Sequence, residues 1–82
     1  MKRRGVSAVI KVFHKIEPYL DKGRALSVQD IAKITGLSVI MVRRHLKFLV
    51  EWNFLVVLRK GRYKYYTKPE VIEQKLIELQ AQ

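Results

Sequence analysis

Apolar residues recur every three or four positions in three stretches of the chain, and this spacing predicts three helices that each bury one face. We expect these helices over residues 6–20, 27–35 and 38–52. Pro18 lacks a backbone donor, so the first helix is expected to kink or end near Ile16. The positions expected to point inward are Val9, Ile10, Phe13, Ile16, Leu20, Val28, Ile31, Ala32, Ile34, Val42, Leu46 and Leu49.

Local signals mark the ends of the second and third helices. Ser27 and Asp30 have the spacing of a capping box, in which each side chain accepts a hydrogen bond from the backbone amide of the other residue. Gly36 is expected to end the second helix in the left-handed conformation, and Ser38 to cap the third. Only a tight turn is left between these two helices.

The pattern changes after the third helix. Residues 54–66 contain two strand-like runs separated by Lys60-Gly61, which predicts a β-hairpin in which Gly61 supplies a positive φ angle. A minimal strand at residues 25–26 is expected to pair with it. A last helix is expected over residues 68–80, since Pro69 is tolerated in a first turn. Residues 1–82 are thus expected to form one α+β domain with a three-helix core, a hairpin and a C-terminal helix.

The charge of the chain indicates the class of its partner. The 82 residues include 17 Lys and Arg against 7 Asp and Glu, a net charge of +10. A small domain with this excess repels itself unless a polyanion neutralises it. Nucleic acid is the commonest such partner, followed by an anionic membrane surface, and the plainer alternative is a basic surface that only maintains solubility. Because 49% of the residues are apolar, we expect a folded domain rather than a disordered basic tail.

Several function classes find no support in the sequence. The chain has no cysteine, which excludes disulfides, thiolate metal sites and cysteine nucleophiles. Its acidic residues and two histidines form no paired carboxylate or ligand cluster, and His45 is expected to pack against the preceding helix. We therefore expect no enzymatic activity, no metal, no cofactor and no small-molecule ligand. No apolar run is long enough to span a membrane and no signal peptide is apparent, so we expect a cytoplasmic, nucleoid-associated protein.

Residues 27–38, SVQDIAKITGLS, and residues 42–49, VRRHLKFL, resemble the winged helix-turn-helix family of transcription regulators. The likeness is to the small prokaryotic and archaeal regulators of the ArsR and MarR type, and it covers nearly the whole chain. It implies a recognition helix that begins at Ser38 and a hairpin that forms the wing. The chain departs from the family at Asn53, where many members have glycine, and at residues 39–41, where members often carry polar base-reading side chains.

The resemblance implies binding of double-stranded DNA, with the recognition helix in the major groove and the wing on the minor groove or its phosphates. Arg43 and Arg44 lie about 100° apart around the helix, so we expect one to read a guanine edge and the other to hold phosphate. Tyr63 and Tyr65 are expected to pack across the hairpin. The expected DNA-contacting residues are Ser38, Val39, Ile40, Arg43, Arg44 and Lys47 in the helix, Arg59, Lys60, Arg62 and Lys64 in the wing, and Lys2, Arg3 and Arg4 in an N-terminal arm or solvated tail.

The last predicted helix needs a cover for its apolar side, because an isolated helix of this length is marginal in water. Its apolar residues Ile72, Leu76 and Leu79 either cover the protein's own core or pair with a second copy. The resemblance implies a homodimer formed through terminal helices, and Val12 and Tyr19 of the first helix are candidates for the same seam.

Two alternative functions remain open at the level of sequence. One is a protein-interaction module within a larger transcription assembly. Phe48 and Trp52 would be its apolar anchor, although we expect both in the core. The other is a nonspecific architectural nucleic-acid binder, with RNA included among its partners.

Overall fold

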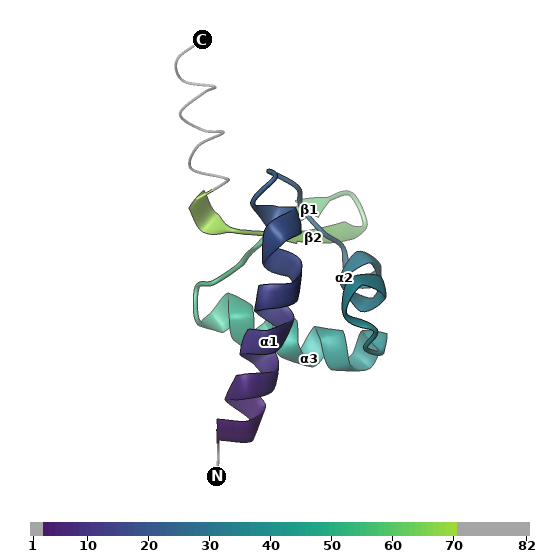
Figure 1. The fold of residues 1–82 in the computed structure, drawn as a ribbon. Coiled ribbons are helices and arrows are strands. Elements are labelled where there is room, and N and C mark those ends of the chain that lie inside the picture. Colours follow the sequence, from purple (N-terminus) through teal and green to yellow (C-terminus); the bar gives the residue numbers. More distant parts are fainter. Residues whose placement is uncertain (1–2, 71–82) are drawn as a thin grey trace.

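The computed structural model describes residues 3–70, and their side chains from Ser7 onward. Within this range the chain forms helices followed by an antiparallel hairpin, an α+β arrangement consistent with a winged helix, as expected (Figure 1). The elements are α1 Arg3–Leu20, α2 Val28–Thr35, α3 Val39–Glu51, β1 Val56–Lys60 and β2 Tyr63–Thr67.

Helix α1 is longer than the sequence predicted. The helix continues through Pro18 to Leu20, so the prediction that it ends near Ile16 was wrong. Pro18 is exposed and lies in the last turn, so its missing donor removes one bond on the solvent side. Beyond it, the bond from the Asp21 amide to the Glu17 carbonyl is intact at 2.8 Å. At the other end Arg3 and Arg4 belong to the helix, in keeping with the good helix propensity of arginine, so their backbone is not a disordered arm, while their contact with DNA stays a prediction. Lys2 lies outside the described residues.

The predicted caps join α2 to α3 through a short turn. The Ser27 Oγ accepts from the Asp30 amide and the Asp30 Oδ2 accepts from the Ser27 amide, both at 3.1 Å. Gly36 ends α2 with a φ of 75°, a left-handed conformation in which a side chain is strained. The Ser38 Oγ accepts from the Met41 amide at 3.2 Å and starts α3. The capping predictions are therefore confirmed.

One aliphatic core lies where the three helices meet. Most of the inward predictions are confirmed, but Ile10 is 39% exposed and Val12 is buried in its place. The buried stripe of α1 passes through Val12, and Ile10 lies about 100° around the helix from its neighbour Val9. A buried Val12 is not available to a dimer seam. The fully buried apolar residues are Val9, Val12, Ile16, Leu20, Leu26, Ile31, Val42, Leu46, Leu49 and Leu55.

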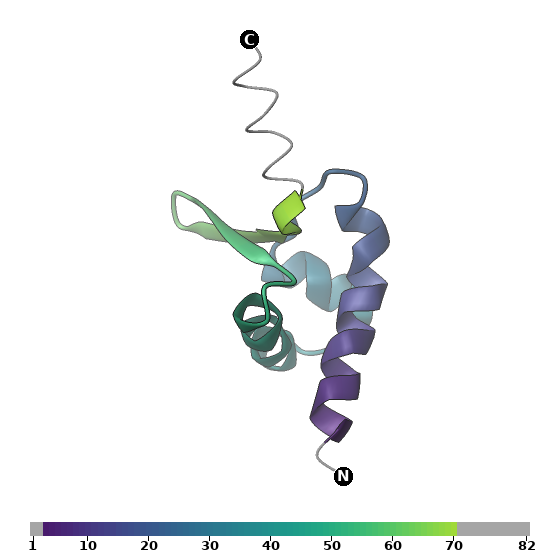
Figure 2. The same ribbon diagram turned by 90° about the vertical axis from the view of Figure 1, so that its left-hand side faces the viewer.

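The hairpin projects beyond the helices on the side away from α1, and α3 lies below it (Figure 2). Lys60 pairs with Tyr63, so Gly61 and Arg62 form a two-residue turn in which Gly61 has a φ of 61°. Positive φ at the first turn position is the type II′ geometry that suits a twisted hairpin. As expected, Leu26 adds a third short strand, through paired backbone bonds with Tyr66 of 2.9 and 2.7 Å.

Lys68 ties the end of the hairpin to α1. Its Nζ lies 2.8 Å from Oε2 of Glu17 and 2.7 Å from Oδ1 of Asp21. Pro69 and Glu70, the last described residues, have a helical backbone. The rest of the predicted helix over residues 68–80 lies outside the described residues. So do its proposed interface residues Ile72, Leu76 and Leu79.

None of the helices within residues 3–70 has the length and apolar character needed to cross a membrane.

The Lys68 ion pairs predict a pH-dependent contribution to stability. The hydrogen bond from Lys68 lowers the pKa of the Glu17 carboxyl, so its contribution is complete above the usual carboxyl pKa and is lost as the pH falls through the lowered value. The hydrogen bonds to Asp21 and Glu17 raise the pKa of Lys68, so its contribution is lost only as the pH rises through that raised value.

Lys68→Gln should therefore lower the Tm at about pH 7, and its difference from wild type should shrink towards strongly acidic and strongly basic pH. Thermal unfolding followed by circular dichroism across the pH range measures this difference. Lys22→Gln, in the exposed turn after α1, is the matched control and should differ little from wild type at any pH. A Lys68→Gln deficit that stays constant with pH would contradict the assignment.

Candidate nucleic-acid interface

The outward side of α3 carries the side chains that the sequence placed at a DNA surface. Because Val42, Leu46 and Leu49 are buried, the helical period directs the opposite side of α3 into solvent. Ile40 is 69% exposed there, and Arg44 and Lys47 are exposed beside it. At the start of the helix Ser38 is exposed and Val39 is half-buried.

Arg43 lies on the flank of α3 that faces the hairpin, and it lines a hollow with residues from two other elements. The hollow has a volume of about 560 Å³ and lies between α3, the start of α2 and the tip of the hairpin. The structure thus brings Arg43 together with Arg62 and Lys64, which follow it by about twenty residues in the chain. The lining residues are Ser27, Val28, Gln29, Arg43, Arg62, Tyr63, Lys64 and Tyr66.

The start of α2 contributes backbone charge to the same hollow. The first amides of a helix have no carbonyl partner within the helix, and they form the positive end of its dipole. Ser27 occupies the Asp30 amide through the capping box, while Val28 and Gln29 are the first two helical residues and line the hollow. Such amides beside converging cations suit an anion of the size of a phosphate group.

The hairpin holds like charges against each other. Arg59 and Lys64 are direct partners across the two strands, so their side chains share one face of the hairpin. Lys60 ends β1 and Arg62 lies in the turn, and all four basic side chains are exposed. Like charges directly opposite each other destabilise a hairpin, and a bound anion would relieve this repulsion.

The acidic side chains that the structure describes do not neutralise this surface. Glu17 and Asp21 both pair with Lys68, and Glu17 also lies 3.6 Å from Nδ1 of His14. Asp30 is engaged in its own helix cap. Among the side chains of residues 7–70, no ion pair involves α3 or the hairpin. The guanidinium groups of Arg43 and Arg44 are therefore exposed and not held by any described carboxylate.

Tyr63 is a site residue that the sequence analysis missed. It was expected to pack across the hairpin, but it is 66% exposed and lines the hollow beside Lys64. Its cross-strand partner is Lys60 at the tip of the hairpin, which extends beyond the core. Its position two residues after the turn glycine was the available signal. Tyr65 is half-buried, in keeping with the expected packing.

A group of three exposed aromatic side chains and the half-buried Phe13, the aromatic patch, lies on the other flank of α3 beside α1. It consists of Phe13, Phe48, Trp52 and Phe54, with ring centroids 5.4 Å apart for Phe13 and Phe54 and 5.7 Å apart for Phe48 and Trp52. Phe48 is 43% and Trp52 is 38% exposed, so the expectation that both are core residues was wrong. The helical period places both on the side of α3 next to the buried Leu49, and α3 ends at Glu51, directly before Trp52.

Comparison with known proteins assigns no family: no protein-family model matches the chain, and no curated protein sequence matches it. The resemblance to winged-helix regulators stays a prediction that rests on the motifs and on this arrangement.

Arg59 and Lys64 carry like charges at directly paired positions, and this predicts a repulsive coupling that a double-mutant cycle can measure. Lys64→Gln and Arg59→Gln should each stabilise the fold by up to about 1 kcal/mol at low ionic strength, and the double variant should gain less than the sum. Urea unfolding measures the three free energies, and added salt should shrink the coupling. The matched cycle of Lys22→Gln with Lys64→Gln should show none. An attractive coupling between Arg59 and Lys64 would refute the repulsion.

Proposed function

We propose that the protein binds double-stranded DNA as a sequence-preferring transcription regulator, with α3 in the major groove and the hairpin on the adjoining minor groove or its phosphates. The observation that carries this proposal is the hollow in which Arg43 of α3 meets Arg62 and Lys64 of the hairpin. A helix with its side chains is about 10–12 Å wide, which matches the width of the major groove.

The charge distribution supports a polyanion rather than a single acidic group. Basic side chains extend from α3 through the hollow to the hairpin tip, and no described carboxylate pairs with them. A row of phosphates spaced along a backbone can neutralise such a surface, whereas one small anion would leave most of it charged. The amides at the start of α2 add a further phosphate contact.

The two arginines of α3 take different roles in this proposal. Arg43 faces the hollow, where it holds a phosphate together with the start of α2. Arg44 points outward between Ile40 and Lys47, so it reaches into the groove and reads a guanine edge through its two parallel donors. The exposed Ile40 contacts a thymine methyl group, which adds a weaker preference.

We also propose that the protein acts as a homodimer through its last helix, at Ile72, Leu76 and Leu79, so that two half-sites about one helical turn apart form a pseudo-palindrome.

The aromatic patch supports the second candidate function, attachment to a protein partner. Exposed apolar groups that are contiguous mark interaction surfaces more often than solitary ones do. Trp52→Ala should abolish such an attachment without affecting DNA binding, and Arg44→Ala should do the reverse.

The roles of Arg43 and Arg44 predict different losses of DNA affinity. On a duplex selected from a random pool, Arg44→Ala should weaken binding by about 10–100-fold but change binding to unrelated duplex much less. Arg43→Ala should weaken both duplexes equally and reduce the salt slope by about one. Fluorescence anisotropy measures these affinities, with Lys22→Ala as the control that should bind like wild type. Equal effects of the two substitutions would overturn the assignment of roles.

The proposal also predicts a steep salt dependence. If about six basic residues contact phosphates, the logarithm of the association constant should fall with the logarithm of salt concentration at a slope of roughly −5. A flat dependence, or a folded protein that does not bind duplex DNA at low ionic strength, would refute DNA binding. Competition between duplex DNA and duplex RNA tests the architectural alternative, which predicts little preference between sequences.

A further inference from the structure

A second, smaller pocket lies on the α1 side of the recognition helix. It has a volume of about 280 Å³ and opens between α1, the turn that joins α2 to α3, and the first turns of α3. Val12, Leu37 and Met41 form an apolar floor. The sequence indicated no small-molecule ligand, because these residues come from three separate segments of the chain.

His45 is the most deeply buried polar residue that lines this pocket. Its residue surface is only 8% exposed, and its side chain lines the pocket. No hydrogen bond joins its imidazole to another group within the described part of the chain. Because no fully buried side-chain nitrogen or oxygen among the described residues lacks a partner, the unpaired imidazole nitrogens are open to the pocket, where a bound group can contact them. Thr35 also lines the pocket, but its hydroxyl is already engaged, since its Oγ1 donates to the Ile31 carbonyl at 2.8 Å.

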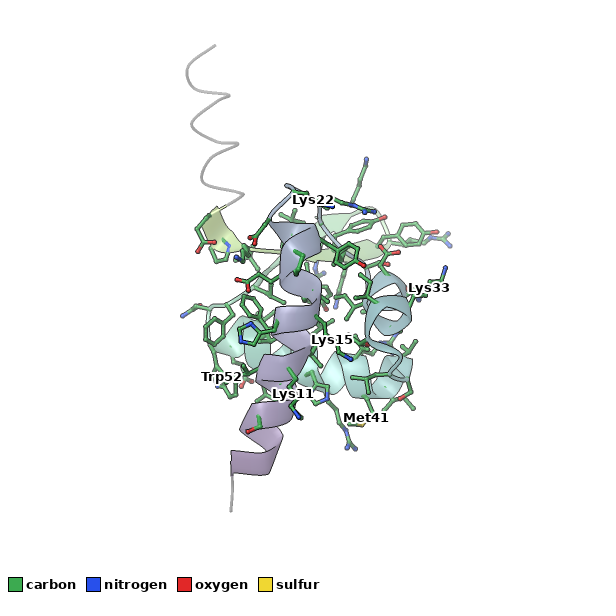
Figure 3. All side chains as sticks on the ribbon, viewed as in Figure 1. Lys11, Lys15, Lys22, Lys33, Met41 and Trp52 are labelled. Atoms are coloured by element: carbon green, nitrogen blue, oxygen red, sulfur yellow. The ribbon has the colours of Figure 1, made fainter. Side chains whose placement is uncertain are left out.

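The rim of the pocket is positively charged. Lys11 and Lys15 lie one turn apart on α1, both line the pocket, and both are exposed. Figure 3 shows them on the side of α1 towards Met41, with Trp52 on the opposite side. Neither lysine forms an ion pair with a side chain of residues 7–70. Like charges one turn apart repel each other, and an anion between them removes that repulsion.

We propose that this pocket binds a small aliphatic monocarboxylate, with its hydrocarbon part on Val12, Leu37 and Met41 and its carboxylate between His45 and the two lysines. The apolar floor disfavours a strongly hydrated anion such as phosphate, and the basic rim disfavours a neutral hydrocarbon. A shape of this kind, mostly apolar with a few convergent polar groups, is typical of ligand sites. Met41 and His45 belong to the same helix as Arg44, so a bound ligand contacts α3 from the side opposite to the hairpin.

Binding is tested without DNA, so its failure would leave the proposed function untouched. Hexanoate and cyclohexanecarboxylate are titrated into the full-length protein, alongside the neutral hexanamide and cyclohexanecarboxamide, and backbone amide shifts are followed by NMR. The carboxylates should shift the amides around residues 11–15, 37 and 41–45 in a saturable manner and bind at least about tenfold more tightly than the amides. No saturation up to about 10 mM, or equal binding of acid and amide, would overturn the proposal.

Two sets of variants locate the site. The double variant Lys11→Gln with Lys15→Gln should weaken carboxylate binding about tenfold, whereas Lys22→Gln with Lys33→Gln, which removes the same charge elsewhere, should leave it unchanged. Equal weakening by both pairs would show nonspecific attraction and sink the proposal. His45→Gln should weaken carboxylates more than amides. Because His45 is buried, the fold of the His45→Gln variant is checked first. If that variant unfolds, the exposed lysine variants still decide the test.

Discussion

The burial of one side of α3 in a single aliphatic core is the constraint on which the rest of the molecule depends. Val42, Leu46 and Leu49 pack with Ile16 and Leu20 of α1, and a domain of this size has no second core to bury another face. Because this side of α3 is buried, the helical period alone directs Arg44 and Lys47 into solvent. The same packing leaves two flanks of α3 only partly covered, and these flanks hold the hollow on one side and the aromatic patch and the His45 pocket on the other.

Charge is distributed so that stability and the proposed function oppose each other. Among the described residues, the carboxylates of Glu17 and Asp21 are drawn to Lys68, where they hold the end of the hairpin against α1. This leaves the outer hairpin without acidic partners, and Arg59 faces Lys64 directly. A fold selected only for stability would place a carboxylate at one of these positions. Repulsion that a polyanion relieves is the physical signature expected of a nucleic-acid surface.

The α1 side of α3 combines two kinds of chemistry within a short length of helix. Near its start, Met41 and His45 line a pocket with a charged rim, and near its end Phe48 and Trp52 belong to the aromatic patch. Both features arise because α1 crosses α3 and covers only the middle of this flank (Figure 3). The helix that we propose to bind DNA on one side thus leaves its other side open to a small ligand and to a protein, and either would contact the same helix.

The sequence alone determined the features that depend on neighbours within one helical turn or one hairpin. The Ser27 capping box, the left-handed Gly36, the turn at Gly61 and the inward stripe of α3 were all predictable, because spacing and backbone conformation decide them locally. Only the tertiary structure decided which distant residues meet: Arg43 with Lys64 across the hollow, the exposure of Tyr63 and Trp52, and His45 facing a pocket. Such juxtapositions depend on how the helices cross and how far the core extends, and no local sequence pattern encodes the crossing geometry or the extent of the core.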